Sequence, residues 1–451
     1  MEEVKVMSPN GGLGAGIIKK SFEDGLKEKP DVIALDAGSS DPGPYYLGAG
    51  VATEGKNSVK RDLEYLLLAQ QQNKIPVITG SATTTGAKKN LEWTIDIAKE
   101  VAKEKGLHFK LAKIEADIDK EMLKKALANN KIKTFETGKA LTAEEIDKST
   151  RIVAQMGVEP FVNALKLDAD VIIAGRAYDP AVIASFPVYK GFDKGLAIHM
   201  GKILECGCMA CEPGSGFDVL MGTIKKDCFE LTPVNKQRKC TASSVAAHTL
   251  YEKDNPIKLA LPGGLLDLTG TKFKEIGNRT VRVTGSKFIE QPYTVKLEGS
   301  SKVGYRSIFI AGVRDPIAIQ HIDEIISAVT EEIEEQFSKQ NGNSYRIIFH
   351  VYGKNGVMGD LEPVKQITSH ELGIVGEVVA EDQEMADEIC GQLYHHMLHR
   401  TYPGRKATAG NLAFLYSPQV ISAGPVYEFN IYHLLEVDDP VSLFPISIED
   451  I

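Results

Sequence analysis

The sequence predicts a mixed α/β protein with two domains, over residues 1–290 and 291–451. In the first range, short apolar runs alternate with amphipathic segments and end in glycine-rich loops, which is typical of a parallel sheet covered by helices. In the second range, the expected elements follow the order β-α-β-β-α-β, which is the split ferredoxin-like α+β motif. A chain of 451 residues also exceeds what one hydrophobic core usually organises, since domains typically contain roughly 100–200 residues.

Five apolar runs predict the parallel strands of the first domain. They occupy residues 4–8, 31–36, 76–79, 109–114 and 170–174, with helices near 16–28, 59–73 and 88–106. The pattern is compatible with an open sheet and with barrel-like closure. Residues 195–290 are rich in Gly, Cys, Ser and Thr and show few helical periods, so irregular strands over the sheet edge or the site are expected there.

The second domain is predicted from two helical stripes set among strands. Apolar residues spaced by three or four predict a helix near 317–339. Asp382 is the expected cap of a second helix that reaches about residue 402, where Pro403 ends it. Strands are expected at 293–298, 305–313, 345–352, 372–380 and 408–414.

Composition restricts the partners and the compartment. The chain is 43% hydrophobic and 25% charged, with a net charge of −9 and no basic block, which argues against nucleic acid and membrane surfaces as partners. Six cysteines are too few for a disulfide framework. The first residues carry two acids, unlike a secretory leader, and no apolar run approaches the roughly 18 residues of a spanning helix. A cytoplasmic protein is therefore expected.

Four predicted strand ends carry small or polar residues, at 10–14, 36–41, 79–83 and 175–179. Parallel sheets bind ligands beyond the carboxyl ends of their strands, where glycine allows close approach and hydroxyls offer hydrogen bonds. The first loop lacks the third glycine of a dinucleotide fingerprint, and no Gly-Lys-Ser/Thr follows it, which disfavours nucleotides and an ATP-dependent ligase. The residues expected to bind substrate here are Gly12, Ser39, Ser40, Tyr45, Ser81, Thr83 and Arg176.

Acid–base chemistry is expected from side chains near these loops, because carboxyl and imidazole groups transfer protons near neutral pH. The candidates are Asp36, Asp41, Asp179, His199 and Glu205. Some of these residues have structural alternatives. Arg176 clamps an anion, braces its loop through Asp179, or does both. Glu205 is either a base or an exposed helix carboxylate, and His199 is either an acid or a satisfied core histidine.

Two groups of residues are candidates for binding a metal. Cys206, Cys208 and Cys211 lack a fourth cysteine at zinc spacing, which disfavours a structural zinc or iron–sulfur site. Carboxylates of the predicted site leave a catalytic Mg²⁺ or Mn²⁺ as an alternative. In the second domain, Lys354 belongs to a glycine-rich stretch, 353–363, that forms either a lid over the site or a tight turn at a contact.

Several longer motifs together resemble the acyclic terpene utilisation AtuA family over nearly the whole chain; they lie at 36–48, 175–179, 203–207, 311–316, 351–359 and 408–414. The resemblance implies a family-specific amino-terminal domain, a ferredoxin-fold carboxy-terminal domain, and a link to catabolism of branched acyclic terpenoid acids as coenzyme A thioesters. The loops after Asp41 and around 208–212 look like those of an anaerobe-type branch, which is often accompanied by a small separate protein and by genes for carboxylic-acid metabolism.

The expected function is that of an enzyme of carboxylic-acid or acyl-CoA catabolism, a lyase, hydratase or isomerase acting on a small branched carboxylate or thioester. The expected assembly is a homo-oligomer, with or without a small accessory protein. The alternative is a non-catalytic ligand-binding or assembly subunit that works with a small partner.

Overall fold

The computed structural model describes residues 2–135, 138–251, 255–337 and 344–451, and they form two compact units. The first unit contains residues 1–301 and 429–451, and the second contains residues 302–428. Two strands, β15 (Thr294–Val313) and β19 (Ile421–Glu436), each begin in one unit and end in the other. The domain ranges 1–290 and 291–451 remain a prediction. In the described part of the chain, no helix combines the length and apolarity needed to cross a lipid bilayer.

The described residues of the first unit form a ten-stranded mixed sheet in the order β12-β13-β9-β8-β1-β2-β3-β7-β4-β20. Only its centre, from β1 to β4, is parallel, while β8 and β20 pair antiparallel at either side of that centre. The expectation of a parallel sheet is therefore right for the core and incomplete at the edges. The sheet is open, because β12 and β20 do not pair with each other.

The strands of this sheet have the following bounds: β1 (Glu3–Ser8), β2 (Val32–Asp36), β3 (Val77–Gly80), β4 (Lys110–Ile114), β7 (Val171–Ala174), β8 (Leu220–Lys225), β9 (Cys228–Pro233), β12 (Lys272–Ile276), β13 (Thr280–Thr284) and β20 (Ile446–Asp450). Elsewhere in the unit, β10 (Lys258–Leu261), β11 (Gly264–Asp267) and β14 (Lys287–Glu290) form a small antiparallel sheet, and β5 (Ile132–Thr134) and β6 (Ser149–Ala154) pair with β19 and β15.

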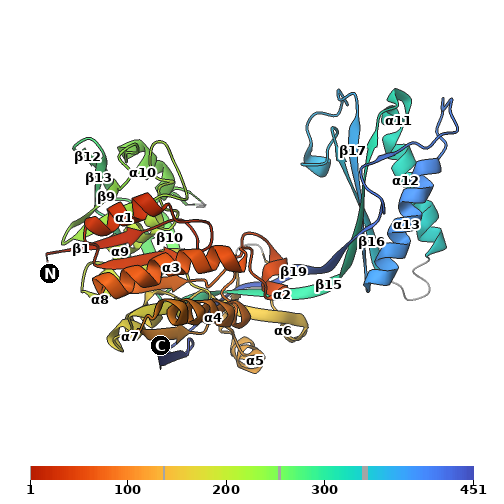
Figure 1. Ribbon diagram of the computed structural model, residues 1–451. Helices are drawn as coiled ribbons and strands as arrows, with labels where there is room; N and C mark the ends of the chain where they lie inside the picture. Colours follow the sequence, from red (N-terminus) through yellow and green to blue (C-terminus); the bar gives the residue numbers. More distant parts are fainter. Residues whose placement is uncertain (1, 136–137, 252–254, 338–343) are drawn as a thin grey trace. The chain divides into compact units, whose positions relative to one another are not determined.

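Helices cover both faces of the central strands, since alternate residues of a strand point to opposite faces. Ile33 and Leu35 pack into one core with α1, α3 and α4, which lie on the near side in Figure 1. Val32 and Ala34 pack into the other core with α7, α8 and α9. Asp36 is the next residue of β2 on the same face as Val32 and Ala34. The helices of the unit are α1 (Lys19–Lys27), α2 (Pro44–Ala49), α3 (Lys56–Asn73), α4 (Lys88–Lys105), α5 (Lys120–Ala128), α6 (Ala143–Lys148), α7 (Val158–Lys166), α8 (Asp179–Tyr189), α9 (Lys194–Leu204) and α10 (Ala242–Thr249).

The segment 195–290 contains more helix than the sequence indicated. Helix α9 is buried from Gly195 to Leu204, and α10 follows two strands later. A helix that is buried all round carries no amphipathic stripe, so its period does not appear in the sequence. The strands of the segment do cover an edge, because β8 pairs with β1 and extends the sheet.

The second unit is an antiparallel sheet with helices. β16 (Tyr345–Tyr352) pairs with β17 (Leu372–Ala380), and β17 pairs with β15. The helices α11 (Pro316–Gln320), α12 (Ile322–Gln336) and α13 (Gln383–His399) supply the apolar residues of its core, and Asp382 caps α13 as expected.

Two strand predictions for the range 291–451 are wrong. Separate strands were expected at 293–298 and 305–313, but one continuous strand, β15, runs through both because the residues between them extend without a turn. The strand expected at 408–414 is reduced to β18 (Ala413–Phe414), and the long strand β19 follows where no strand was predicted.

Candidate functional site

Three loops meet where the central parallel strands end. Asp36 is the last residue of β2, Ser81 follows β3, and Arg176 follows β7, which are neighbouring strands. Backbone hydrogen bonds join the loops: Ala37 N–H donates to Gly80 O at 2.8 Å, and Ser81 N–H donates to Gly175 O at 2.9 Å. The carboxyl ends of parallel strands lie at one edge, so the sequence order places these loops together.

Arg176 is buried, and its guanidinium is engaged by protein acceptors. Nε donates to Glu298 Oε2 at 2.8 Å, and Nη1 donates to Ser81 Oγ at 3.1 Å and to Asp179 Oδ1 at 3.3 Å. Nη2 donates to the second oxygen of Glu298 at 3.4 Å. These contacts match the bracing interpretation of Arg176 and leave little donor capacity for a substrate anion.

Glu298 of β15 is the centre of a buried ion cluster. Its carboxylate also forms an ion pair with Lys296 Nζ at 2.8 Å. It accepts hydrogen bonds from Ser40 Oγ at 3.1 Å and from Gln155 Nε2 at 3.2 Å. Burial raises the pKa of Glu298, but the cations of Arg176 and Lys296 outweigh it and lower that pKa to about 2. Glu298 is therefore ionised at neutral pH, and its charge is compensated.

Asp36 has the opposite environment. Its side chain is buried, and in the described part of the chain its Oδ1 has no hydrogen-bond partner. Burial is the largest cause that raises the pKa of Asp36 well above its usual value, and the carboxylate of Asp179 raises it further, against the opposing cation of Arg176. Asp36 thus holds a proton at a pH where most carboxyl groups are ionised.

More ionisable groups surround Asp36. Asp179, the first residue of α8, is 31% exposed, and Lys202 of α9 contacts Glu205 at its C-cap, both buried. Burial raises the pKa of Asp179, although Arg176 and Lys202 oppose this and its partial exposure weakens it. Burial, followed by these carboxylates, also raises the pKa of Tyr178. Perturbed ionisable groups gathered at a strand end are typical of functional sites.

The loop that carries Ser81 has a strained backbone. Ser81, Thr83 and Thr84 all have positive φ angles, of 51°, 35° and 81°. Residues with side chains avoid this region, and such strain is found most often at functional sites. Gly38 lies directly against the loop, since a Cβ on Gly38 would stand 2.2 Å from Thr84 N.

Replacing Gly38 by alanine is expected to displace the strained loop and to lower the free energy of unfolding by about 1–3 kcal/mol, because the added methyl meets backbone that cannot move aside. Urea denaturation measures the change. Gly55→Ala is a control for glycine loss alone, since Gly55, like Gly38, has no positive φ, and it has no atom within 4 Å of its Cβ position. Equal losses in the two variants would contradict the packing argument.

Other predicted residues serve different roles. His199 is fully buried, and its two ring nitrogens lie 2.6 Å from Ser286 Oγ and 3.1 Å from Thr249 Oγ1. Burial lowers the pKa of His199 to about 3, which describes a satisfied, neutral core histidine. The Thr83 hydroxyl lies 3.0 Å from that of Thr94 and is directed to α4.

The remaining predicted residues are near the loops or in the other unit. Ser39 accepts a hydrogen bond from the backbone of Asp41, and the exposed Asp41 acts on Asp179 through its charge. Gly12 lies in the loop after β1, where its carbonyl accepts from Ala15 N–H, and Tyr45 is 41% exposed on α2. Lys354 belongs to the second unit, where its ammonium contacts Asp323.

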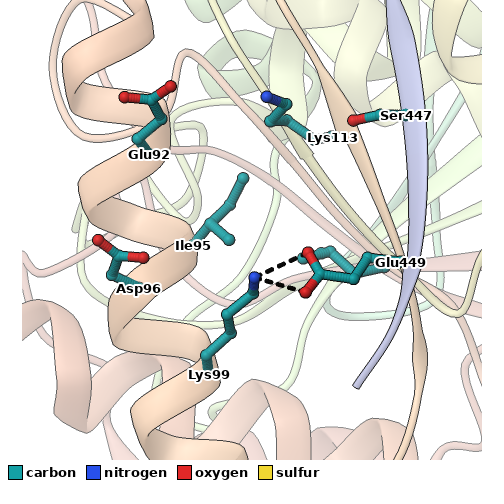
Figure 2. A pocket seen from close by; sticks show the side chains of 8 residues that line it. Glu92, Ile95, Asp96, Lys99, Lys113, Ser447 and Glu449 are labelled. Atoms are coloured by element: carbon teal, nitrogen blue, oxygen red, sulfur yellow. Dashed lines mark hydrogen bonds and ion pairs between the residues drawn. The ribbon is translucent and has the colours of Figure 1, made fainter.

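The cluster is not arranged as a metal site. In residues 2–135, 138–251, 255–337 and 344–451, no group of three or more His, Cys, Asp or Glu side chains is placed to hold a metal ion. A pocket of about 200 Å³ lies elsewhere, between α4 and the strands β4 and β20 (Figure 2). Its Lys99 and Glu449 pair with each other at 2.6 Å on a partly exposed surface. This ordinary surface ion pair gives no reason to place chemistry in the pocket.

Sequence reasoning missed Glu298, Lys202 and Tyr178. Glu298 comes from a strand more than 100 positions away from Arg176, and nothing local connects them. Lys202 offers a weak signal, because it is a single charge within the apolar run of α9. Tyr178 lies inside the motif 175–179, between two residues that were assigned roles.

Comparison with known proteins gives one family. The family model described as acyclic terpene utilisation family protein AtuA matches residues 51–226 and 227–422, which together cover well over half of the chain. No curated protein and no solved structure shows a significant match.

Proposed function

Because this chain belongs to the acyclic terpene utilisation AtuA family, we propose that it is an enzyme of carboxylic-acid or acyl-CoA catabolism that acts by acid–base chemistry. The observation that carries the proposal is the buried carboxyl of Asp36, with its raised pKa and an oxygen without a partner in the described part of the chain. General acid–base groups need a pKa near the working pH, and burial beside other carboxylates is how a carboxyl reaches it.

The proposed reaction is a lyase, hydratase or isomerase step on a small branched carboxylate or its thioester. Asp36 gives a proton to, or takes one from, the substrate atom whose charge changes. Asp179, which is 31% exposed, acts on this carboxyl through its charge. Arg176 acts as a positioning residue, because its donors hold Ser81 and Asp179, which both influence Asp36.

The proposal is tested by a thermal-shift panel on the purified chain. The panel contains short di- and tricarboxylates, branched acids and acyl-CoA thioesters, each with and without Mg²⁺ or Mn²⁺. A ligand at 100 times its Kd is expected to stabilise the protein by about 2.7 kcal/mol, which is a clear shift. A hit in one class identifies the substrate class, and a metal-dependent hit supports a divalent ion. No shift with any class would contradict the enzyme proposal.

A second candidate is a non-catalytic subunit that works with a partner protein. In the second unit, Val357 and Leu361 of the glycine-rich stretch 353–363 are 86% and 80% exposed, and Val364, directly after it, is 63% exposed. Neighbouring exposed apolar side chains are typical of interaction surfaces. This candidate predicts a complex in size-exclusion chromatography with light scattering, and no turnover by the chain alone.

We also propose that the second unit is a ferredoxin-like domain. The order of its main elements, β15-α12-β16-β17-α13-β19, supports this assignment, as does the strand order β16-β17-β15-β19.

A further inference from the structure

Three cysteines lie together after the helix that carries Lys202 and Glu205. Cys208, Cys211 and Cys240 are all buried, and Cys211 Sγ lies 3.6 Å from Cys240 Sγ. Cys208 donates its thiol hydrogen to Val219 O at 3.2 Å. The six cysteines, all within the described residues, carry thiols that are not joined by disulfides. The site described above does not use this group.

The backbone around Cys211 and Cys240 is suited to a disulfide. The residues next to them, Glu212 and Lys239, form an antiparallel bridge and exchange hydrogen bonds of 2.8 and 3.1 Å. The position after such a hydrogen-bonded pair is a non-hydrogen-bonded pair, whose Cα atoms are about 4.5 Å apart. Disulfides accept Cα separations of about 4.4–6.8 Å, so only the two side chains have to turn.

We propose that Cys211 and Cys240 are an oxidisable dithiol that a peroxide converts to a disulfide, tying the loop after Glu205 to the strand segment before α10. The Cys211 thiolate attacks one peroxide oxygen, the O–O bond breaks, and a sulfenic acid and water form after one proton is taken up. The Cys240 sulfur then attacks the Cys211 sulfur and displaces hydroxide. This hydroxide takes up the proton of the Cys240 thiol and leaves as a second water.

The surroundings favour Cys211 as the attacking sulfur. The neighbouring thiols of Cys208 and then Cys240 lower the pKa of Cys211, and the Arg238 cation adds to this effect against burial. Thiolates are the reactive form of cysteine. The residues next in sequence to the two cysteines, Glu212 and Lys239, line a surface depression together with Arg238, so the dithiol lies one residue away from the surface on both segments.

Two other thiols serve as internal controls. Burial raises the pKa of Cys390 to about 12, and burial, followed by the charge of Asp227, raises the pKa of Cys228. Neither thiol is expected to react under conditions that oxidise Cys211.

The test uses the full-length chain, reduced, exchanged into thiol-free buffer, exposed to hydrogen peroxide, alkylated with N-ethylmaleimide and digested for mass spectrometry. A peptide pair linked through Cys211 and Cys240, lighter by two hydrogen atoms and split by dithiothreitol, is expected in most molecules. Cys228 and Cys390 should remain alkylated. A chain in which all six thiols are alkylated after peroxide, or one in which the link joins Cys208 to Cys211, would overturn the proposal.

Variants separate the two steps of the reaction. Cys240→Ser should abolish the link and leave a sulfenic acid on Cys211 that dimedone captures. Cys390→Ser is the matched control and should form the link to the wild-type extent. Dimedone labelling of Cys228 or Cys390 in place of Cys211 would contradict the assignment, and the wild-type measurement stands even if a variant fails to fold.

Discussion

Asp36→Asn is expected to lower turnover by about 10²–10⁴-fold, the usual contribution of a general acid or base. The amide keeps the size of the side chain but carries no exchangeable acidic proton. Turnover is measured with whichever carboxylate or thioester stabilises the wild-type chain. The exposed Asp438→Asn, on a side chain that is 84% exposed, is the matched control and should keep full activity. Full turnover by Asp36→Asn would remove Asp36 from the mechanism.

The same variant should keep or increase the stability of the fold at neutral pH. The pKa of Asp36 is raised in the folded state, so the folded chain holds a proton that the unfolded chain has already released. Its contribution to stability therefore falls as the pH rises above its usual value of 3.8 towards the raised folded pKa. A neutral amide at this position does not titrate, so it does not lose stability as the pH rises. Loss of activity without loss of stability is the pattern expected of a functional residue, and urea denaturation at several pH values measures it.

Glu298→Ala is expected to have the largest effect on the fold, a loss of about 3–5 kcal/mol of unfolding free energy. The substitution leaves the cations of Arg176 and Lys296 without their buried counter-charge. Chemical denaturation measures the change. Glu298→Gln keeps the shape of the side chain and should lose less. Glu144→Ala breaks an exposed pair with Lys148 and should cost little stability, so equal losses for the substitutions of Glu298 and Glu144 would contradict the cluster.

The pH dependence of this contribution has the opposite sign to that of Asp36. The pKa of Glu298 is lowered from 4.5 to about 2 in the folded state. The stabilisation is therefore fully present above pH 4.5 and is lost as the pH falls towards about 2. The difference in unfolding free energy between wild type and Glu298→Gln should shrink over that interval. A difference independent of pH would show that the charge of Glu298 does not contribute.

The pattern of apolar and polar residues was sufficient to predict the central strands and part of the candidate site. Strand and helix periods depend on local backbone geometry, so apolar runs indicated β2, β3 and β7 nearly to their bounds. Parallel pairing then brings the ends of these strands to one edge, which is why Asp36, Ser81 and Arg176 were expected near one another.

The contacts of those residues come from parts of the chain that are distant in sequence. Glu298 reaches Arg176 from β15, and this contact supports the bracing role of Arg176, one of the two roles expected for it. His199 has the residue type of an acid, but Ser286 and Thr249 surround it in the core. The physical reason is that pKa values and hydrogen-bond capacity depend on burial and on partners distant in sequence, whereas the direction of a strand depends on its immediate neighbours.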